Sequence, residues 1–156
     1  MAISSMSMCG YHGDCSETFA VGRTDEEAVR LMDVTKTALY EAIKLCRDGR
    51  KLADIGQTIE GIAYEAGYSV IPIFCGHGIG EDFHMKPDII HIGNVGTAVM
   101  KAGMIFTIEP VISEGGDEVE IQEDGWTALS LENSRSAQFE ETILITKEGS
   151  EILTAL

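Results

Sequence analysis

A short stretch rich in glycine and histidine constrains this chain more than any other part of its sequence. It is Cys75–Gly80, which reads CGHGIG, and it is followed by Phe83, His84 and Pro87. Glycine permits turns and close backbone approach that a side chain would block, and neutral histidine is both a common metal ligand and a proton shuttle near pH 7. We therefore predict a loop that holds functional histidines. The alternative is a plain connecting turn with surface histidines.

Three carboxylates in strand-like, otherwise apolar runs point to a metal site. They are Asp14, Glu109 and Glu140, and a buried carboxylate without a partner is costly, so each should face a positive group. Together with His77 they form an oxygen-rich set without thiolates, which suits Mn²⁺, Fe²⁺ or Co²⁺ and also admits Zn²⁺. A metal held in this way lowers the pKa of water, so we expect hydrolysis, with His84 donating to the developing oxyanion. The alternative is that these carboxylates are solvated at the surface of an already acidic protein.

The charge and length of the chain limit its partners and its domain count. The 156 residues carry 11 basic and 26 acidic side chains, a formal net charge of −15. This charge repels phosphate backbones and anionic membrane surfaces, so we expect no direct nucleic-acid partner and no membrane association. The length predicts one domain, residues 1–156, with a sizeable core.

The cysteines and the first residues bear on the compartment. The chain has four cysteines with no CxxC pair, which is typical of reduced thiols inside a cell. They are Cys9, Cys15, Cys46 and Cys75. The segment from Met1 to Met8 has no basic residue and no apolar core of a leader peptide. We therefore expect a cytoplasmic protein.

Two segments have the apolar spacing of helices. Thr24 and Glu27 have the spacing of a capping box, and apolar residues recur at helical intervals from there to Gly49. A second helix is predicted from about Asp54 to Ala66, and Gly67 is its C-terminal stop.

The remaining segments predict strands. Before Gly22 we expect two short strands around a tight turn, with Asp14 at their junction. Further strands are expected over 68–74, 104–109, 119–122, 126–131 and 137–146, and a hairpin loop is expected over 114–118. Pro110 ends the strand directly after Glu109, and strand ends are common places for sites. In the last strand Gln138, Glu140 and Thr142 share one face. This order predicts an α+β fold with a mostly antiparallel sheet and two main helices.

Five motifs in this order resemble those of type I methionine aminopeptidases. They are YHGD at 11–14, GHGIG at 76–80 with FH at 83–84, FTIEP at 106–110, DGWT at 124–127 and SAQFE at 136–140. The similarity covers nearly the whole chain. The glycine-histidine motif alone would also fit the related proline-specific peptidases, whereas the ending at 136–140 favours the methionine type.

The resemblance implies a pita-bread fold and a dinuclear metal centre that removes the initiator methionine from nascent polypeptides. Carried over by motif, Asp14 and Glu140 resemble the two bridging ligands, and His77 and Glu109 resemble further ligands of one metal. The resemblance also gives roles beyond the ligands. These are general base for Glu109, support of the substrate and tetrahedral intermediate for His84, and a place near the methionine pocket, or simple packing, for Trp126.

The chain departs from the family pattern in three ways. The family has another aspartate eleven residues before the position of Asp14, and here that position is Ile3. Isoleucine offers no lone pair, so we expect one tight metal site and a weakened second site. Glu141 stands where the type I pattern usually has histidine. The chain also resembles only the C-terminal catalytic half of the family's fold, a truncated form of it.

Three hypotheses follow from this pattern. The first is a metal-dependent aminopeptidase acting on peptides with N-terminal methionine, impaired by truncation and by Ile3. The second is a non-catalytic pita-bread module that binds peptides or a protein. The third is a proline-specific peptidase of the same superfamily. In each case a half-fold would leave sheet edges and apolar surface uncovered, so we expect self-association or a partner chain.

Overall fold

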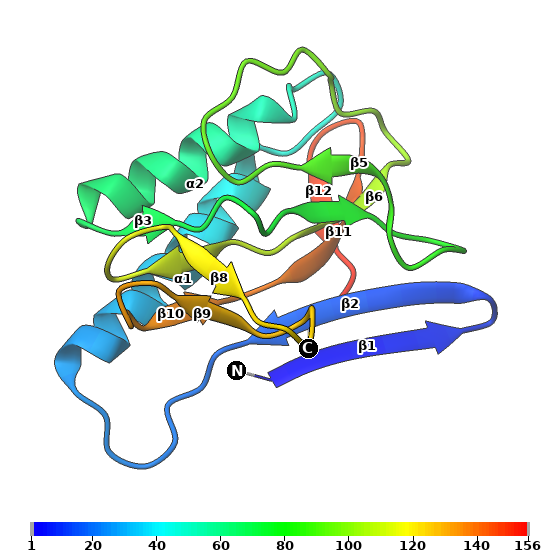
Figure 1. Ribbon diagram of the computed structural model, residues 1–156. Helices are drawn as coiled ribbons and strands as arrows, with labels where there is room; N and C mark the ends of the chain where they lie inside the picture. The colour runs from blue at the N-terminus through cyan, green and yellow to red at the C-terminus, as the bar shows by residue number, and fades with distance from the viewer. Residues whose placement is uncertain (1, 156) are drawn as a thin grey trace.

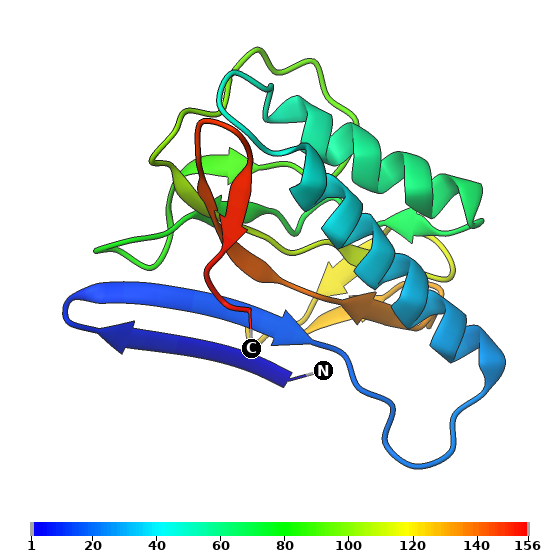
Figure 2. The same cartoon turned by 180° about the vertical axis from the view of Figure 1, so that it is seen from behind.

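The computed structural model describes residues 2–155, with side chains described from Ser4 onward. Two helices lie side by side against one face of curved antiparallel sheets, and a long hairpin runs along the lower edge in Figures 1 and 2. The helices are α1, Glu26–Leu45, and α2, Ala53–Glu65. The strands are β1 Ala2–Met8, β2 Tyr11–Glu17, β3 Ser69–Val70, β4 Gly76–Gly78, β5 Met85–Ile89, β6 Ile105–Ile108, β7 Val111–Ser113, β8 Val119–Ile121, β9 Ala128–Ser130, β10 Ser136–Gln138, β11 Glu141–Ile145 and β12 Ser150–Ile152.

The sheets confirm the predicted α+β class with largely antiparallel pairing. The largest sheet has the order β12-β11-β6-β4-β5, a smaller one has the order β10-β7-β3, and β1-β2 and β8-β9 are hairpins. All strand pairs among the described residues are antiparallel. Within residues 2–155, no helix combines the length and the apolar character that a bilayer span would need.

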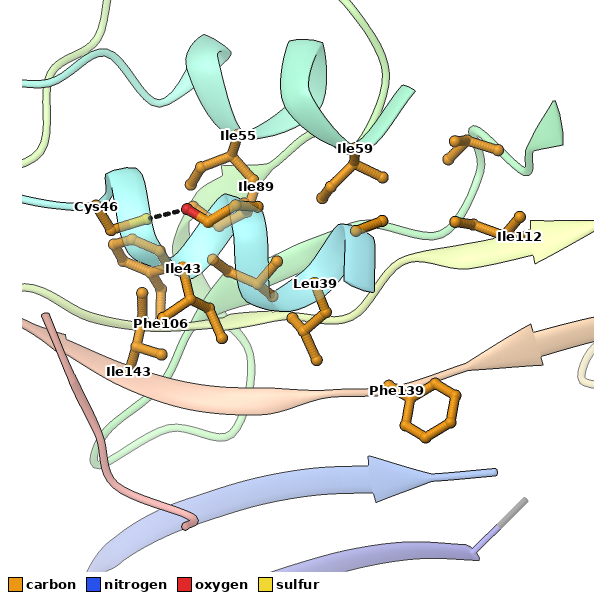
Figure 3. Packing of buried hydrophobic residues seen from close by; sticks show 14 of the residues in the cluster. Leu39, Ile43, Cys46, Ile55, Ile59, Ile89, Phe106, Ile112, Phe139 and Ile143 are labelled. Atoms are coloured by element: carbon orange, nitrogen blue, oxygen red, sulfur yellow. Dashed lines mark hydrogen bonds between the residues drawn. The ribbon is translucent and has the colours of Figure 1, made fainter. Parts of the chain in front are cut away.

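The core lies between the helices and the sheets, as Figure 3 shows. One buried cluster includes Ile55 and Ile59 of α2, Leu39 and Ile43 of α1, and Phe106 of β6. Each of these five side chains is at most 5% exposed. Burial of a large aliphatic or aromatic side chain contributes roughly 1.5–3 kcal/mol, so this layer is the main support of the sheet that carries the site.

Both helices form where the apolar spacing predicts them, but the cap of α1 differs. Asp25, and not Thr24, is the N-cap, and its Oδ1 accepts a hydrogen bond from Ala28 N at 2.8 Å. Aspartate and threonine are both good N-caps, so the competing residue one position later displaces the expected capping box. Gly67 ends α2 as predicted, with a φ of +81°.

The glycine-histidine stretch is a strand and not the predicted loop. Gly76–Gly78 form β4 in the middle of the largest sheet. A Cβ on Gly76 would lie 2.2 Å from the carbonyl oxygen of Thr107, and one on Gly78 would lie 2.3 Å from that of Lys86. The glycines are therefore required for close strand packing and not for a flexible loop. The strand expected over 68–74 is correspondingly short, with only β3 formed.

Two other predictions were wrong in detail in the first two thirds of the chain. The first hairpin turns at Cys9 and Gly10, whose φ values are +54° and +85°. Asp14 consequently lies in the middle of β2 and not at a junction between two short strands. A stretch expected to be loop-rich up to about residue 102 contains β5.

The C-terminal half departs from prediction at two connections. Residues 114–118 connect β7 to β8, and these two strands do not pair with each other, so the hairpin loop predicted there is wrong. The hairpin that forms is β8-β9, and residues 122–127 make its turn. The strand expected over 137–146 is divided into β10 and β11, which belong to different sheets. Glu140 lies at this division and pairs with Ser16 of β2 through two backbone hydrogen bonds.

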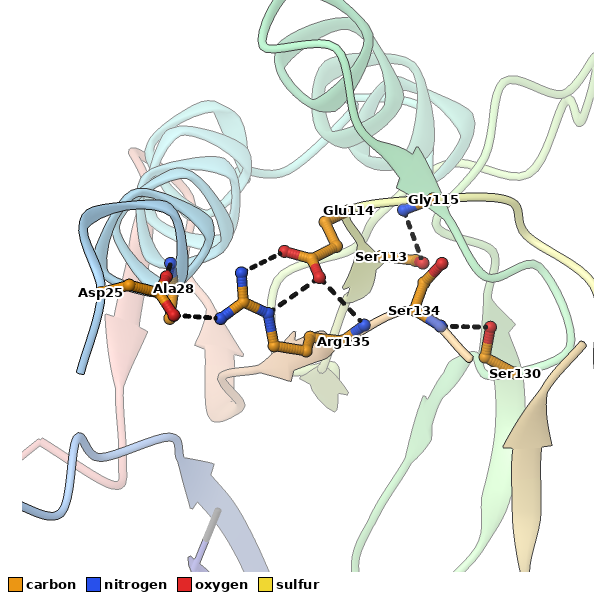
Figure 4. A network of polar contacts seen from close by, with 8 residues as sticks. All are labelled: Asp25, Ala28, Ser113, Glu114, Gly115, Ser130, Ser134 and Arg135. Carbon is orange, nitrogen blue, oxygen red and sulfur yellow. Dashed lines mark hydrogen bonds and ion pairs between the residues drawn. The ribbon is translucent and has the colours of Figure 1, made fainter. Parts of the chain in front are cut away.

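An exposed ion-pair network joins the start of α1 to the β7 end, as Figure 4 shows. Arg135 donates to both carboxylate oxygens of Glu114, at 2.8 and 2.9 Å, and to Asp25 Oδ2 at 2.7 Å. These hydrogen bonds from Arg135 hold the pKa of both carboxyl groups below their usual values. Each acid in this network therefore has a cation beside it.

Candidate metal centre

Three buried side chains from three separate parts of the chain meet in one cleft. Asp14 comes from β2, His77 from β4, and Glu140 from the division between β10 and β11. Each offers one metal-ligating atom, and these atoms lie within 4.8 Å of one another. The three residues are only 6%, 8% and 4% exposed. Such a group of one imidazole and two carboxylates has the composition of a divalent metal site.

Two oxygen atoms of this group have no hydrogen-bond partner among the described residues. They are Asp14 Oδ1 and Glu140 Oε1, both fully buried. Burial raises the pKa of Asp14 and raises that of Glu140 to about 9, where the charges of Glu109 and Asp14 add to the effect. An unpaired buried carboxylate is costly, and a cation would offset that cost. The residues present therefore fit a divalent metal.

The ring of His77 is oriented so that one nitrogen is free for a ligand. Its Nδ1 lies 3.1 Å from the carbonyl oxygen of Gly78 and donates to it, which leaves the lone pair on Nε2. Nε2 lies 3.5 Å from Glu109 Oε1. Burial lowers the pKa of His77, so the neutral form that binds metals is favoured.

Glu109 follows directly after β6, where the sequence predicts a strand end, and its carboxylate is held on both sides. The hydroxyl of Thr107 donates to Oε1 at 3.0 Å, and Gln138 Nε2 donates to Oε2 at 3.3 Å. Burial raises the pKa of Glu109 to about 7. Glu109 lies outside the tightest group of three ligand atoms but contacts His77 within it. Its carboxyl can therefore act as an acid or a base near neutral pH.

Several supporting residues are not among those that the sequence predicted. Thr107 also accepts from His77 N at 3.0 Å, so one hydroxyl connects two proposed ligands. Thr142 accepts from Asp14 N at 3.2 Å and donates to Asp14 O at 2.7 Å, which ties β2 to β11. The signal for Thr142 was present, because it shares a predicted strand face with Glu140. Thr107 and Glu109 are also two residues apart in a predicted strand, which places their side chains on the same face.

His84 and Trp126 line the same cleft but differ in their surroundings. The cleft has a volume of about 1480 Å³ and is lined by both residues as well as by the carboxylates. The His84 ring centroid lies 4.4 Å from that of His77, and His84 is exposed to solvent. Trp126 lies in the β8-β9 turn and is 88% exposed, so it is not packed in a core.

The positions where the chain departs from the expected pattern lie near this site. Ile3 pairs with Ser16 in the β1-β2 ladder, and its side chain lies outside the described residues. Glu17 of β2 is a carboxylate that could take the place of the missing aspartate, but it pairs with Lys36 Nζ at 3.0 Å, so its charge is already balanced. Glu141 accepts from Tyr40 Oη at 2.8 Å, and burial together with this hydrogen bond raises the pKa of Tyr40 to about 12. Glu141 therefore joins α1 to the sheet.

Solved structures define the class of protein. The methionine aminopeptidase of Rickettsia prowazekii matches with a TM-score of 0.94 and 42% identity, over 97% of this chain and 62% of that chain. The prolidase of Pyrococcus furiosus matches with a TM-score of 0.76 and 25% identity, over 97% of this chain and 40% of that chain. The fold is thus the pita-bread fold of these metallopeptidases, as the resemblance implied.

Sequence comparison places the chain more closely. The model of metallopeptidase family M24 matches residues 3–147, and the chain belongs to this family. Human mitochondrial methionine aminopeptidase 1D is 51% identical over 147 residues, 94% of this chain and 44% of that protein. Methionine aminopeptidase A of Synechocystis is 47% identical over 146 residues, 93% of this chain and 58% of that protein. The chain spans about half the length of these curated relatives.

Proposed function

We propose that this chain supplies the metal-binding and catalytic side chains of an aminopeptidase that removes N-terminal methionine from peptides and nascent polypeptides. The observation that carries this proposal is the meeting of Asp14, His77 and Glu140, with two buried carboxylate oxygens left without partners. The identity of 43–52% to proteins named methionine aminopeptidase supports the substrate class. Residues 1–156 form one catalytic unit in this proposal.

In this proposal Asp14, His77, Glu109 and Glu140 hold a divalent metal, which is Mn²⁺, Fe²⁺, Co²⁺ or Zn²⁺. The bound metal supplies a Lewis acid that polarises the substrate carbonyl and lowers the pKa of water. Glu109 accepts a proton from the attacking water at a carboxylate oxygen and returns it to the leaving amine. In the metal-free chain burial raises the pKa of Glu109 to about 7, and a carboxyl group with a raised pKa is suited to take up a proton and return it. Glu109 thus has two roles in this proposal, metal ligand and proton carrier, whereas Asp14 and Glu140 are ligands alone.

His84 is proposed to act on the substrate and not on the metal. It lies at the exposed side of His77 and can donate to the oxygen of the scissile carbonyl as negative charge develops there. His84→Ala should therefore lower kcat about a hundredfold, as loss of an oxyanion donor does, and leave metal content unchanged. Equal loss of metal would make His84 a ligand. Trp126, which also lines the cleft, is proposed to contact the methionine side chain.

The second metal site is proposed to be weak because Ile3 offers no ligand atom. We expect near one tightly bound metal per chain and weak cleavage of methionine peptides, since substrate anchoring suffers. Ile3→Asp should raise the metal stoichiometry measured by elemental analysis. Ser4→Asp is the matched control, because neighbouring positions of a strand face opposite sides. A parent chain that titrates with two equally tight metals would contradict this part of the proposal.

The test of function combines metal analysis with two substrates. The purified chain is stripped with a chelator, reloaded with Mn²⁺ or Co²⁺, and assayed on a Met-Ala peptide and on an Xaa-Pro peptide. Metal-dependent cleavage of the Met-Ala peptide alone supports the proposal, and preference for the Xaa-Pro peptide supports a prolidase. Metal binding without cleavage by the Ile3→Asp variant supports the non-catalytic peptide-binding module.

The chain is also proposed to self-associate or to bind a partner chain. Among the described residues β1 pairs with β2 alone, and its sequence from Ala2 to Met8 has no charged residue or proline to protect the free edge. Met6, Met8 and Leu129 are at least half exposed, which adds apolar surface. Light scattering over a range of concentrations tests this, and a strictly monomeric chain would contradict it.

A cytoplasmic location remains a prediction from the unpaired cysteines.

A further inference from the structure

A buried histidine outside the proposed ligand set contacts the backbone of one proposed ligand. His91 follows β5 and is only 1% exposed. Its Nε2 accepts a hydrogen bond from the backbone N of Glu109 at 3.3 Å. The metal-binding and proton-transfer roles proposed above use the side chain of Glu109 and leave this contact unexplained.

The contact replaces a backbone acceptor at the end of a strand. Glu109 lies one residue beyond β6, and Pro110 after it has no amide hydrogen. Among the described residues, the acceptor for the Glu109 N–H is the His91 ring and not a strand carbonyl. A buried backbone N–H needs an acceptor, so the imidazole completes the strand end.

The ring can do this in one tautomer only. Because Nε2 accepts a hydrogen bond, its lone pair is used there and the ring hydrogen is on Nδ1. Nδ1 makes no hydrogen bond with a described residue. The contact with Glu109 is therefore the one hydrogen bond of the His91 ring within the part of the chain that the structure describes.

We infer that His91 is a positioning residue, which sets the main chain at Glu109 and so places its carboxylate against the metal. The carboxylate is held by Thr107 and Gln138, while the backbone from which it extends is held by His91. Outer partners of this kind orient ligands and affect metal affinity. The inference rests on the proposed metal centre.

The experiment compares two amides that place polar atoms at different points of the histidine ring. Glutamine reaches the position of Nε2, whereas asparagine reaches only that of Nδ1. His91→Gln should keep the Mn²⁺ affinity of the parent within about threefold, and His91→Asn should weaken it by roughly 10–100-fold, the range for lost outer partners of ligands. Affinity is measured by calorimetry on the full chain. The visible spectrum of the Co²⁺-loaded protein reports whether the ligand geometry changes.

A control separates positioning from general loss of stability. Thr35 is fully buried in α1, and its hydroxyl donates to Leu31 O at 2.8 Å. Thr35→Val removes a buried hydrogen bond within α1, between two residues that do not line the cleft, so it should lower the melting temperature without changing Mn²⁺ affinity or the Co²⁺ spectrum.

Each outcome decides between the inference and the proposed function. If the parent binds Mn²⁺ and both His91 variants match it, or if both weaken equally, the positioning role is wrong and the metal centre stands. If the parent binds no Mn²⁺, the proposed metal centre is wrong and the inference is overturned with it. Should His91→Asn fail to fold, His91→Gln decides, because a tenfold loss of affinity in that variant would contradict the inference.

Discussion

The two groups of acidic side chains in this molecule have opposite surroundings. Asp14 and Glu140 are buried, each with an oxygen that has no partner, and their pKa values are raised. Asp25 is exposed and Glu114 is partly exposed, and Arg135 lowers the pKa values of both by hydrogen bonding. This pair already has its cation, whereas the buried group lacks one within the described residues. The difference distinguishes a site from a structural ion pair, although both are clusters of acids.

The largest expected effect is on metal affinity, and it compares one glutamate from each group. Glu140→Gln should weaken Mn²⁺ binding at least by the roughly 100-fold that outer partners of ligands reach. Glu114→Gln should leave it unchanged, because Glu114 contacts Arg135 and not the cleft ligands. Calorimetric titration of both variants provides the measurement. Equal affinities for the two variants would remove the distinction between the groups.

Metal should also stabilise the fold through the buried group. Mn²⁺ at 100 times its dissociation constant contributes about 2.7 kcal/mol to the free energy of unfolding. For a domain of this size, that corresponds to a rise in melting temperature of roughly 5–10 °C. His77→Ala should lose this rise while Arg135→Ala should keep it. A thermal shift in both variants would mean that the metal binds elsewhere.

The pH dependence of stability should have opposite signs in the two groups. Glu140 has a pKa raised from 4.5 to about 9, so the metal-free fold should lose stability as the pH rises through that interval. The lowered pKa values of Asp25 and Glu114 stabilise the fold above about pH 4.5, and this contribution is lost as the pH falls below it. Urea unfolding at several pH values, with and without Mn²⁺, measures both. Bound Mn²⁺ should abolish the loss of stability at high pH and leave the loss of stability below about pH 4.5 unchanged.

The smallest effect should come from Arg135 itself. Arg135→Ala should lower the melting temperature by less than the metal raises it, because exposed ion pairs contribute little. It should also flatten the acid limb of the stability curve and leave Mn²⁺ affinity at the parent value. A large loss of metal affinity in this variant would show that the network supports the cleft.

The sequence predicts the elements whose signals are local. The spacing of apolar residues gives both helices, and Gly67 gives the end of α2. The apolar run before Pro110 gives β6 and the place of Glu109 at its end. The fold class and the family follow from the order of elements and motifs. These signals need no knowledge of what lies across the sheet.

The errors occur where distant segments decide. The glycines of β4 suggest a loop until the carbonyl groups of Thr107 and Lys86 are placed beside them. The division of the last predicted strand at Glu140 depends on its pairing with Ser16, which lies far away in the sequence. His91 has no local signal, because its partner is a backbone N–H and not a side chain.

The glycines of β4 also have a consequence for the kind of ion that the cleft accepts. Gly76 lets β4 lie so close to β6 that an added methyl group would meet the Thr107 carbonyl oxygen at 2.2 Å. The separation of these two strands sets the span between His77 and Glu109. Gly76→Ala would force the strands apart and widen that span. We expect such a widened site to discriminate less well between ions of different radius, because selectivity among divalent metals follows from cavity geometry more than from raw affinity.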